Sequence, residues 1–153
     1  METPLTSLAQ LATGESGDDA DAVEPRYQIG AVAERTSLSH HTLRHWDEAG
    51  LVSPSGRSDG GFRLYSDADI ERILVIRRMK PLGFTLEQMQ QLLDAIDTLR
   101  APTSDAEARA RSAATLKACA QQAHESLERI RRHLGYAEEF SDLISGWIRA
   151  TDT

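Results

Sequence analysis

Cysteine is almost absent from this chain of 153 residues, in which Cys119 is the single example. One cysteine excludes a disulfide within the chain and favours a reducing compartment. Long apolar runs are absent too, because no stretch approaches the ~20 residues that a membrane helix needs. The N-terminus also lacks the basic start and apolar segment of a secretory signal. We therefore expect a cytoplasmic protein with no membrane partner.

Basic residues are missing from the first 25 positions, which hold six acidic residues and a charge of −6. The whole chain carries −7, but residues 26–82 carry +2 and residues 83–153 carry −3. Electrostatic attraction acts over ~8–10 Å, so the charge of a docking face matters more than the total. We predict a disordered acidic tail at 1–25 and assign any contact with a polyanion to the basic segment.

The signatures of common enzyme classes are also missing. The sequence contains no phosphate-binding loop, no metal triad and no serine or cysteine nucleophile beside a base. Cys119 lies five residues before His124 and fourteen before His133, so the three cannot share one helical face to bind a metal. The sequence therefore predicts a non-enzymatic protein without catalytic residues, a cofactor or a metal.

Two short helices joined by a tight turn are predicted near the start of the basic segment. Ile29 and Val32 share one helical face, which predicts a helix over 29–35. Ser39 is a good N-cap for a second helix over 40–49. In a helix-turn-helix unit, the second helix enters the major groove of DNA.

A Gly-rich hairpin is predicted after these helices. Leu51 and Val52 would begin one strand, residues 58–61 form a turn signal, and residues 62–65 alternate as a returning strand would. We predict a two-stranded wing that packs against the helices, because a lone hairpin is marginally stable in water.

Two further helices complete a predicted DNA-binding domain over residues 26–101. Ser66 can cap the first of them. Thr85 and Gln88 form a capping box for the second, which ends near residue 101.

A long helix is predicted over 104–139, followed by a short C-terminal helix or tail at 140–153. Its apolar residues recur at alternating steps of four and three, the heptad pattern of a coiled coil. A rod of ~54 Å is too long for the preceding domain to cover, so we predict a homodimer along this helix. The alternative is a helix that folds back on its own domain. The predicted dimer residues are Leu116, Ala120, Ala123, Leu127, Ile130, Leu134 and Ala137.

Side chains that suit DNA contact recur on the second helix and the wing. Arg44 lies on the exposed flank of the helix, where arginine can read guanine or bind a phosphate. Arg63 and Tyr65 alternate to one side of the wing strand, so both could meet one phosphate path. Singly, each could be an ordinary solvated residue, but the joint pattern indicates a DNA-binding surface. The predicted contacts are Thr42, Arg44, His45, Trp46, Arg57, Arg63, Tyr65 and Lys80.

Taken in order, these motifs resemble the DNA-binding region of the MerR family of bacterial transcription regulators. The resemblance covers about 110 of the 153 residues, and the long helix is similar to the antiparallel dimerisation helix of that family. One departure is His45, which replaces the usual tyrosine and its phosphate contact with an imidazole. The matching segments are Ile29-Gly30-Ala31-Val32-Ala33, Thr42-Leu43-Arg44-His45-Trp46-Asp47, Gly50-Leu51-Val52, Gly61-Phe62-Arg63-Leu64-Tyr65 and Leu82-Gly83-Phe84-Thr85-Leu86.

The resemblance implies a mainly α fold, in which a winged helix-turn-helix domain precedes an antiparallel coiled-coil helix. It implies a homodimer on a palindromic operator between promoter elements that are spaced too widely. Bending and untwisting of that DNA would realign the elements for RNA polymerase. The expected partners are double-stranded DNA, a second copy of the chain and RNA polymerase, all at the bacterial nucleoid.

Two alternatives stay open. One is a coiled-coil adaptor that binds other proteins through the long helix and the acidic tail. The other is a repressor or nucleoid-type binder of the same fold that acts without an effector. Metal-sensing and redox-sensing relatives hold cysteine pairs or clusters beyond the dimer helix, whereas Cys119 is expected to be a small half-buried side chain. The sequence therefore names no inducer.

Overall fold

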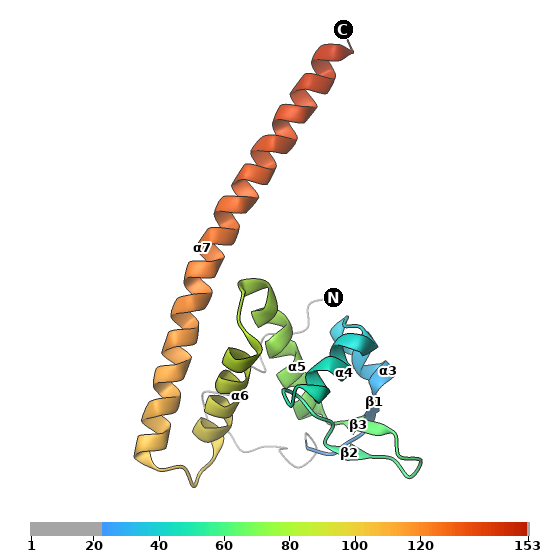
Figure 1. The fold of residues 1–153 in the computed structure, drawn as a ribbon, viewed down its shortest axis with the longest axis vertical. Coiled ribbons are helices and arrows are strands. Elements are labelled where there is room, and N and C mark those ends of the chain that lie inside the picture. The colour runs from blue at the N-terminus through green and yellow to red at the C-terminus, as the bar shows by residue number, and fades with distance from the viewer. Residues whose placement is uncertain (1–22, 153) are drawn as a thin grey trace.

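A computed structural model describes residues 23–152 and is dominated by helices (Figure 1). The predicted disordered tail at 1–25 lies outside the described residues, apart from its last three positions. Within the described part, no helix is long and apolar enough to cross a membrane. The elements are β1 (Tyr27–Gln28), α3 (Ile29–Thr36), α4 (His40–Glu48), β2 (Gly56–Arg57), β3 (Arg63–Tyr65), α5 (Asp67–Met79), η2 (Lys80–Leu82), α6 (Leu86–Arg100) and α7 (Ala106–Thr151).

Helices α3 and α4 form the predicted helix-turn-helix unit. The side chain of Ser39 accepts a hydrogen bond from the backbone N–H of Thr42 and so caps α4. Ser37, just after α3, has a φ of 55°, the left-handed conformation that turns the chain sharply toward α4. Val32 and Leu43 are buried, so the two helices share one core.

The wing differs from the prediction in where its first strand begins. Strand β2 pairs antiparallel with β3, whereas Leu51 and Val52 form a buried turn before it. The N–H groups of both residues donate to the carbonyl of Trp46, at 2.9 and 3.4 Å, so they finish α4. The predicted strand at 51–52 is therefore wrong. Strand β1, which was not predicted, pairs with the other edge of β3.

Helices α5 and α6 complete the domain and begin with capping boxes. Ser66 pairs with Asp69 in α5, and Thr85 pairs with Gln88 in α6, as the sequence indicated for the second pair. These helices contribute about half of the core side chains. The buried core comprises Val32, Leu43, Trp46, Leu51, Val52, Tyr65, Ile70, Ile73, Ile76, Met79, Phe84, Met89 and Leu93.

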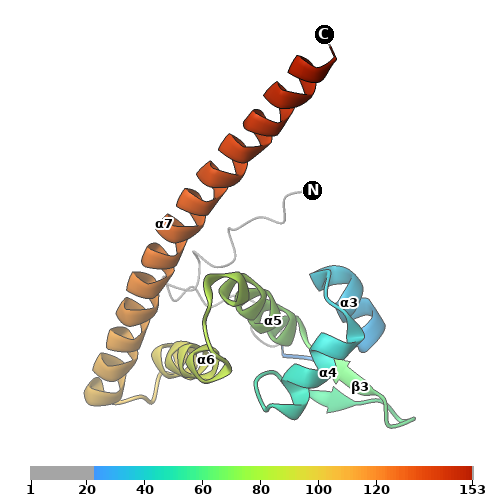
Figure 2. The ribbon, with the colours of Figure 1, turned by 45° about the horizontal axis from the view of Figure 1, so that its top comes forward.

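Helix α7 is one uninterrupted helix of 46 residues, which gives a length of ~69 Å. The short C-terminal helix predicted at 140–153 is therefore wrong, as is the predicted end of the long helix at 139. Gly135 does not break the helix, because one interior glycine costs only about 1 kcal/mol relative to alanine. The first half of α7 lies beside α6, and the second half projects beyond the domain (Figures 1 and 2).

Candidate nucleic-acid interface

Helix α4 is anchored on one side and open on the other. Leu43 and Trp46 are buried in the core. Arg44 and His45 are exposed, and Thr42 is half-buried at the first turn. The amphipathic helix therefore fixes its apolar side against the domain and leaves Arg44 and His45 available to a ligand.

Two of the predicted DNA contacts are core residues. The side chains of Trp46 and Tyr65 are only 2% and 1% exposed. The ring of Trp46 packs on the core as predicted, whereas the phosphate contact predicted for Tyr65 stays a prediction that this conformation does not support, because its hydroxyl is enclosed. The reason is that β3 runs directly into Ser66, the buried cap of α5, so the end of the strand turns inward.

Burial also governs the ionisation of this tyrosine. It raises the pKa of the Tyr65 phenol above its ordinary value of 10.0, and the nearby carboxylate of Asp47 raises the pKa further. The phenolic oxygen has no hydrogen-bond partner among the described residues. Tyr65 therefore contributes an apolar ring to the core, while its phenolic oxygen makes no hydrogen bond with the described residues.

Replacing Tyr65 with phenylalanine should leave DNA affinity unchanged within about twofold. It should also not lower the free energy of unfolding, since an unpartnered buried hydroxyl costs about 1–3 kcal/mol. Because the folded-state pKa is raised, tyrosine's contribution to stability is constant below pH 10.0 and falls as the pH rises further. Above that pH, the free energy of unfolding of the variant should therefore increase relative to that of the wild type.

Urea unfolding at neutral and alkaline pH, together with a DNA-binding titration, measures these effects. Tyr136→Phe is the control, because that side chain is 64% exposed. A large loss of DNA affinity on replacing Tyr65 would show that the hydroxyl does reach the DNA.

An ion pair ties the wing to α4. The Nε atom of Arg63 lies 3.0 Å from Oδ2 of Asp47. The N–H is not aimed along that line, since Nε makes no hydrogen bond, so the attraction is between charges. The Arg63 side chain remains 36% exposed. The pair therefore holds the wing strand against α4, and the two elements predicted to bind DNA form one unit.

The remaining cations have different surroundings. Arg57 donates from Nη1 to the carbonyl of Gly61, at 3.0 Å, and closes the wing turn. Arg77 donates from Nη1 to the carbonyl of Thr36, at 2.6 Å, and joins α5 to the end of α3. Lys80 is exposed at the far end of α5, ~20 Å along that helix from the wing. Lys80 therefore lies apart from the wing surface, at the end of α5 that contacts α3.

Sequence reasoning missed the roles of Asp47 and Arg77. No local signal marks the ion pair of Asp47 with the wing, because Arg63 lies 16 positions further along the chain. Arg77 joins α5 to the end of α3 through the carbonyl of Thr36. No local signal marks its bond to Thr36, because the two residues are 41 positions apart.

The first half of α7 packs on its own domain through small and polar residues. Ser126 donates to the carbonyl of Leu82 at 2.8 Å, and the amide of Gln88 donates to Gln122 at 2.8 Å. Cys119 is half-buried on this face, and burial raises the pKa of its thiol. A raised pKa leaves less reactive thiolate.

The predicted dimer seam is only partly used within the chain. Ala123 packs against the domain core. Leu127, Ile130 and Leu134 are 39%, 40% and 56% exposed. Beyond residue 126, no other element of the described chain covers the seam, because α7 has left the domain (Figure 1).

Comparison with known proteins gives the family. A model described as MerR HTH family regulatory protein matches residues 27–96, and one described as MerR, DNA binding, matches residues 70–137. The HTH-type transcriptional activator mta of Bacillus subtilis is 45% identical over 69 residues, which cover 45% of this chain and 27% of that protein. The mercuric resistance operon regulatory protein of Bacillus cereus is 32% identical over 80 residues, which cover 52% of this chain and 61% of that protein.

The chain thus spans less than two thirds of the length of these relatives. A solved structure of HiNmlR, a MerR family regulator lacking the sensor domain, bound to promoter DNA, has a TM-score of 0.57 with this chain. It is 20% identical and covers 74% of this chain and 85% of that one, so it shows the shared fold. The family models and the winged helix-turn-helix architecture agree, and the chain belongs to the MerR family of DNA-binding transcription regulators, which is not a family of enzymes.

Proposed function

We propose that the protein regulates transcription as a homodimer on a palindromic promoter operator. Each copy would place α4 in a major groove and the wing on the adjacent backbone. Bending and untwisting of the DNA between the two half-sites would then realign promoter elements for RNA polymerase. The observation that carries this proposal is the Asp47–Arg63 ion pair, which fixes the wing beside the exposed flank of α4 that holds Arg44.

The second half of α7 supports a dimer because it is apolar and uncovered. Besides the seam residues, five large side chains project from it with exposed fractions of 54–64%. Burying such surface against a second helix is favourable, since it removes apolar area from water. These five side chains are Tyr136, Phe140, Leu143, Trp147 and Ile148.

The heptad pattern is compatible with a definite register of two antiparallel copies, which is part of the proposal. In such a pair, each a position faces a d position of the other chain. If Leu134 faces Ala137 of the second copy, the symmetry axis falls between Gly135 and Tyr136. The other seam layers then pair Leu127 with Ile144, Ala123 with Ile148 and Ile130 with Ser141.

Charge along α7 favours the same register. Residues 129–133 contain three arginines, and residues 138–142 contain three carboxylates, on either side of that axis. An antiparallel pair brings the basic segment of one copy beside the acidic segment of the other, whereas a parallel pair in register brings like charges together. Arg131 and Glu138 occupy the e positions that flank the seam.

The exposed residues Tyr136, Phe140, Leu143 and Trp147, which we call the aromatic stripe, also have a place in this arrangement. Ser112, Cys119 and Ser126 face the domain of their own chain. Steps of three and four along the same helical face lead from these residues to Tyr136 and Trp147. In this register, residues 143–151 of one α7 run next to residues 120–128 of the other helix, where that helix packs on its own domain. The end of the stripe at Trp147 would therefore meet the partner's domain, so each α7 would contact both domains.

Selection from a pool of random duplexes tests the proposed function. The purified protein should enrich an inverted repeat and bind it as a dimer. Each phosphate contact should add about −0.9 to the slope of log affinity against log salt. A protein that enriches no duplex, or that binds with a flat salt response, would instead fit the coiled-coil adaptor, for which the exposed aromatic stripe is the supporting observation.

A further inference from the structure

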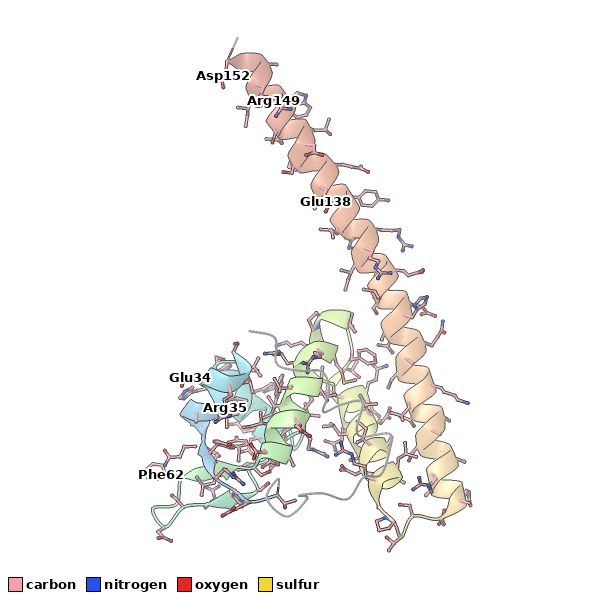
Figure 3. All side chains as sticks on the ribbon, turned by 180° about the vertical axis from the view of Figure 1, so that it is seen from behind. Glu34, Arg35, Phe62, Glu138, Arg149 and Asp152 are labelled. Atoms are coloured by element: carbon pink, nitrogen blue, oxygen red, sulfur yellow. The ribbon has the colours of Figure 1, made fainter. Side chains whose placement is uncertain are left out.

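The tip of the wing displays an aromatic side chain to solvent. Phe62 is 63% exposed, and over residues 23–105 only Val23, at 62%, approaches that value among large apolar residues. In Figure 3, Phe62 lies on the wing, away from the helices. The domain core does not use this ring, so it is accessible to a partner outside the chain.

The turn that carries Phe62 is held by several hydrogen bonds. The N–H of Ser58 donates to the carbonyl of Phe62 at 2.9 Å, and the N–H of Phe62 donates to the Ser58 hydroxyl at 3.2 Å. Gly61 donates to the carbonyl of Ser58 at 2.9 Å and accepts from Arg57 at 3.0 Å. The backbone around the ring is therefore fixed before any ligand binds, which lowers the entropy cost of a contact there.

Gly60 determines where the ring lies. A Cβ atom added at Gly60 would meet two ring carbons of Phe62 at 3.1 and 3.2 Å. The ring therefore lies against the face of Gly60, in space that any larger residue would occupy. The neighbouring atoms belong to a side chain that can rotate, so alanine at this position would displace the ring without breaking the turn.

Two arginines lie at the base of the turn that carries the ring. Arg57 and Arg63 are directly paired across β2 and β3, and the turn with Phe62 connects those strands. Guanidinium groups suit the phosphates of the two strands that border a DNA groove. An apolar group beyond them, in the turn, suits the sugar edges and base steps inside the groove, where apolar wedges are used by proteins that kink DNA.

We infer that Phe62 is an apolar DNA contact that enters the minor groove beside the major groove occupied by α4. The ring partly unstacks a base step there, and the two wings of a dimer together support the bend in the DNA. This inference rests on the proposed function, because it needs a wing that meets DNA.

Phe62→Ala is the first test, on the selected operator duplex and with the full chain. Affinity should fall about tenfold, and the end-to-end distance of a doubly labelled duplex, measured by energy transfer, should show a smaller bend. The salt slope should stay unchanged, because no phosphate contact is lost. Arg63→Ala is the matched comparison, since loss of a phosphate contact should lower the slope by about 0.9 in magnitude per site.

Gly60→Ala tests whether the position of the Phe62 ring matters, separately from whether a ring is present. In the wild-type background it should weaken binding and reduce the bend. In the Phe62→Ala background it should change neither, because there is no ring to displace. Circular dichroism checks that all variants keep the helical content of the wild type.

The outcomes distinguish the two proposals. If the wild type binds its operator but Phe62→Ala binds and bends it equally well, the inference about Phe62 is wrong and the proposed function stands. Additive effects of Gly60→Ala and Phe62→Ala on binding would also contradict the inference, because Gly60→Ala would then weaken binding even when no ring is present. A wild-type protein that enriches no duplex overturns the proposed function and, with it, the contact.

Discussion

Replacing Leu134 with glutamate is expected to convert the proposed dimer into monomers at micromolar concentration. Leu134 is 56% exposed in the single chain, so the substitution should not unfold the monomer. In the paired seam it would bury one carboxylate on each side of the symmetry axis, and the desolvation of each buried ion costs several kcal/mol. We expect the dimer dissociation constant to rise by at least ~100-fold, measured by sedimentation equilibrium.

The matched control is Gln121→Glu. Gln121 is exposed on α7 and bonds to Glu125 one turn away, so the control introduces the same group outside the seam. The control should remain dimeric, and both variants should keep the helicity of the wild type. A Leu134→Glu protein that still sediments as a dimer would mean that another surface joins the two copies.

A charge exchange on α7 examines the register within the same experiment. Arg131→Glu would place a carboxylate beside Glu138 of the second copy and should weaken the dimer about tenfold, since two repulsive pairs form. Adding Glu138→Arg to the same chain should restore the wild-type affinity. Lack of restoration would indicate another register or a parallel pair.

Arg44→Ala should give the largest loss of operator affinity among single substitutions on α4. Arg44 is exposed on the flank of α4 that faces away from the core. A bidentate contact with guanine is worth about 1–3 kcal/mol, and a dimer loses two such contacts. We expect affinity for the operator to fall by about 100-fold, with relaxed preference at one base pair in each half-site.

Competition between the operator and duplexes with single base changes measures both effects. Arg111→Ala is the control, because Arg111 is an exposed arginine on α7 that pairs with Glu107 at 2.8 Å and lies far from the wing in the chain. Its binding should match that of the wild type. If Arg44→Ala weakens every duplex equally, the residue binds a phosphate and does not read a base.

The helices of the DNA-binding domain could be predicted because their signals are local. Ser39 caps α4, and Thr85 with Gln88 caps α6, through hydrogen bonds to residues three positions away. Each of these caps stabilises a helix whose apolar spacing was already visible. The start of the wing could not be predicted in this way, because Leu51 and Val52 have the composition of a strand but are used to close α4 against the core.

The exposure of the candidate site residues could be predicted on α4, where it follows from helix geometry. It was predicted less well on the wing. Arg44 and His45 lie on the polar flank of α4, which the positions of Leu43 and Trp46 already define. Alternation placed Arg63 and Tyr65 together, but it did not reveal that the strand turns inward at its end. The ion pair between Arg63 and Asp47 joins two segments that are distant in sequence, so no local pattern contained it.

The amino-acid sequence alone determined that α7 is a helix with an apolar heptad seam, and that a basic helix-turn-helix segment precedes it. Only the tertiary structure decided which side of α7 packs on its own domain, through Cys119 and Ser126, and that Leu134 stays open. The physical reason is that helix formation depends on hydrogen bonds and caps within a few residues. Burial depends on which distant segments compete for the same surface, and that competition is resolved only when the whole chain is folded.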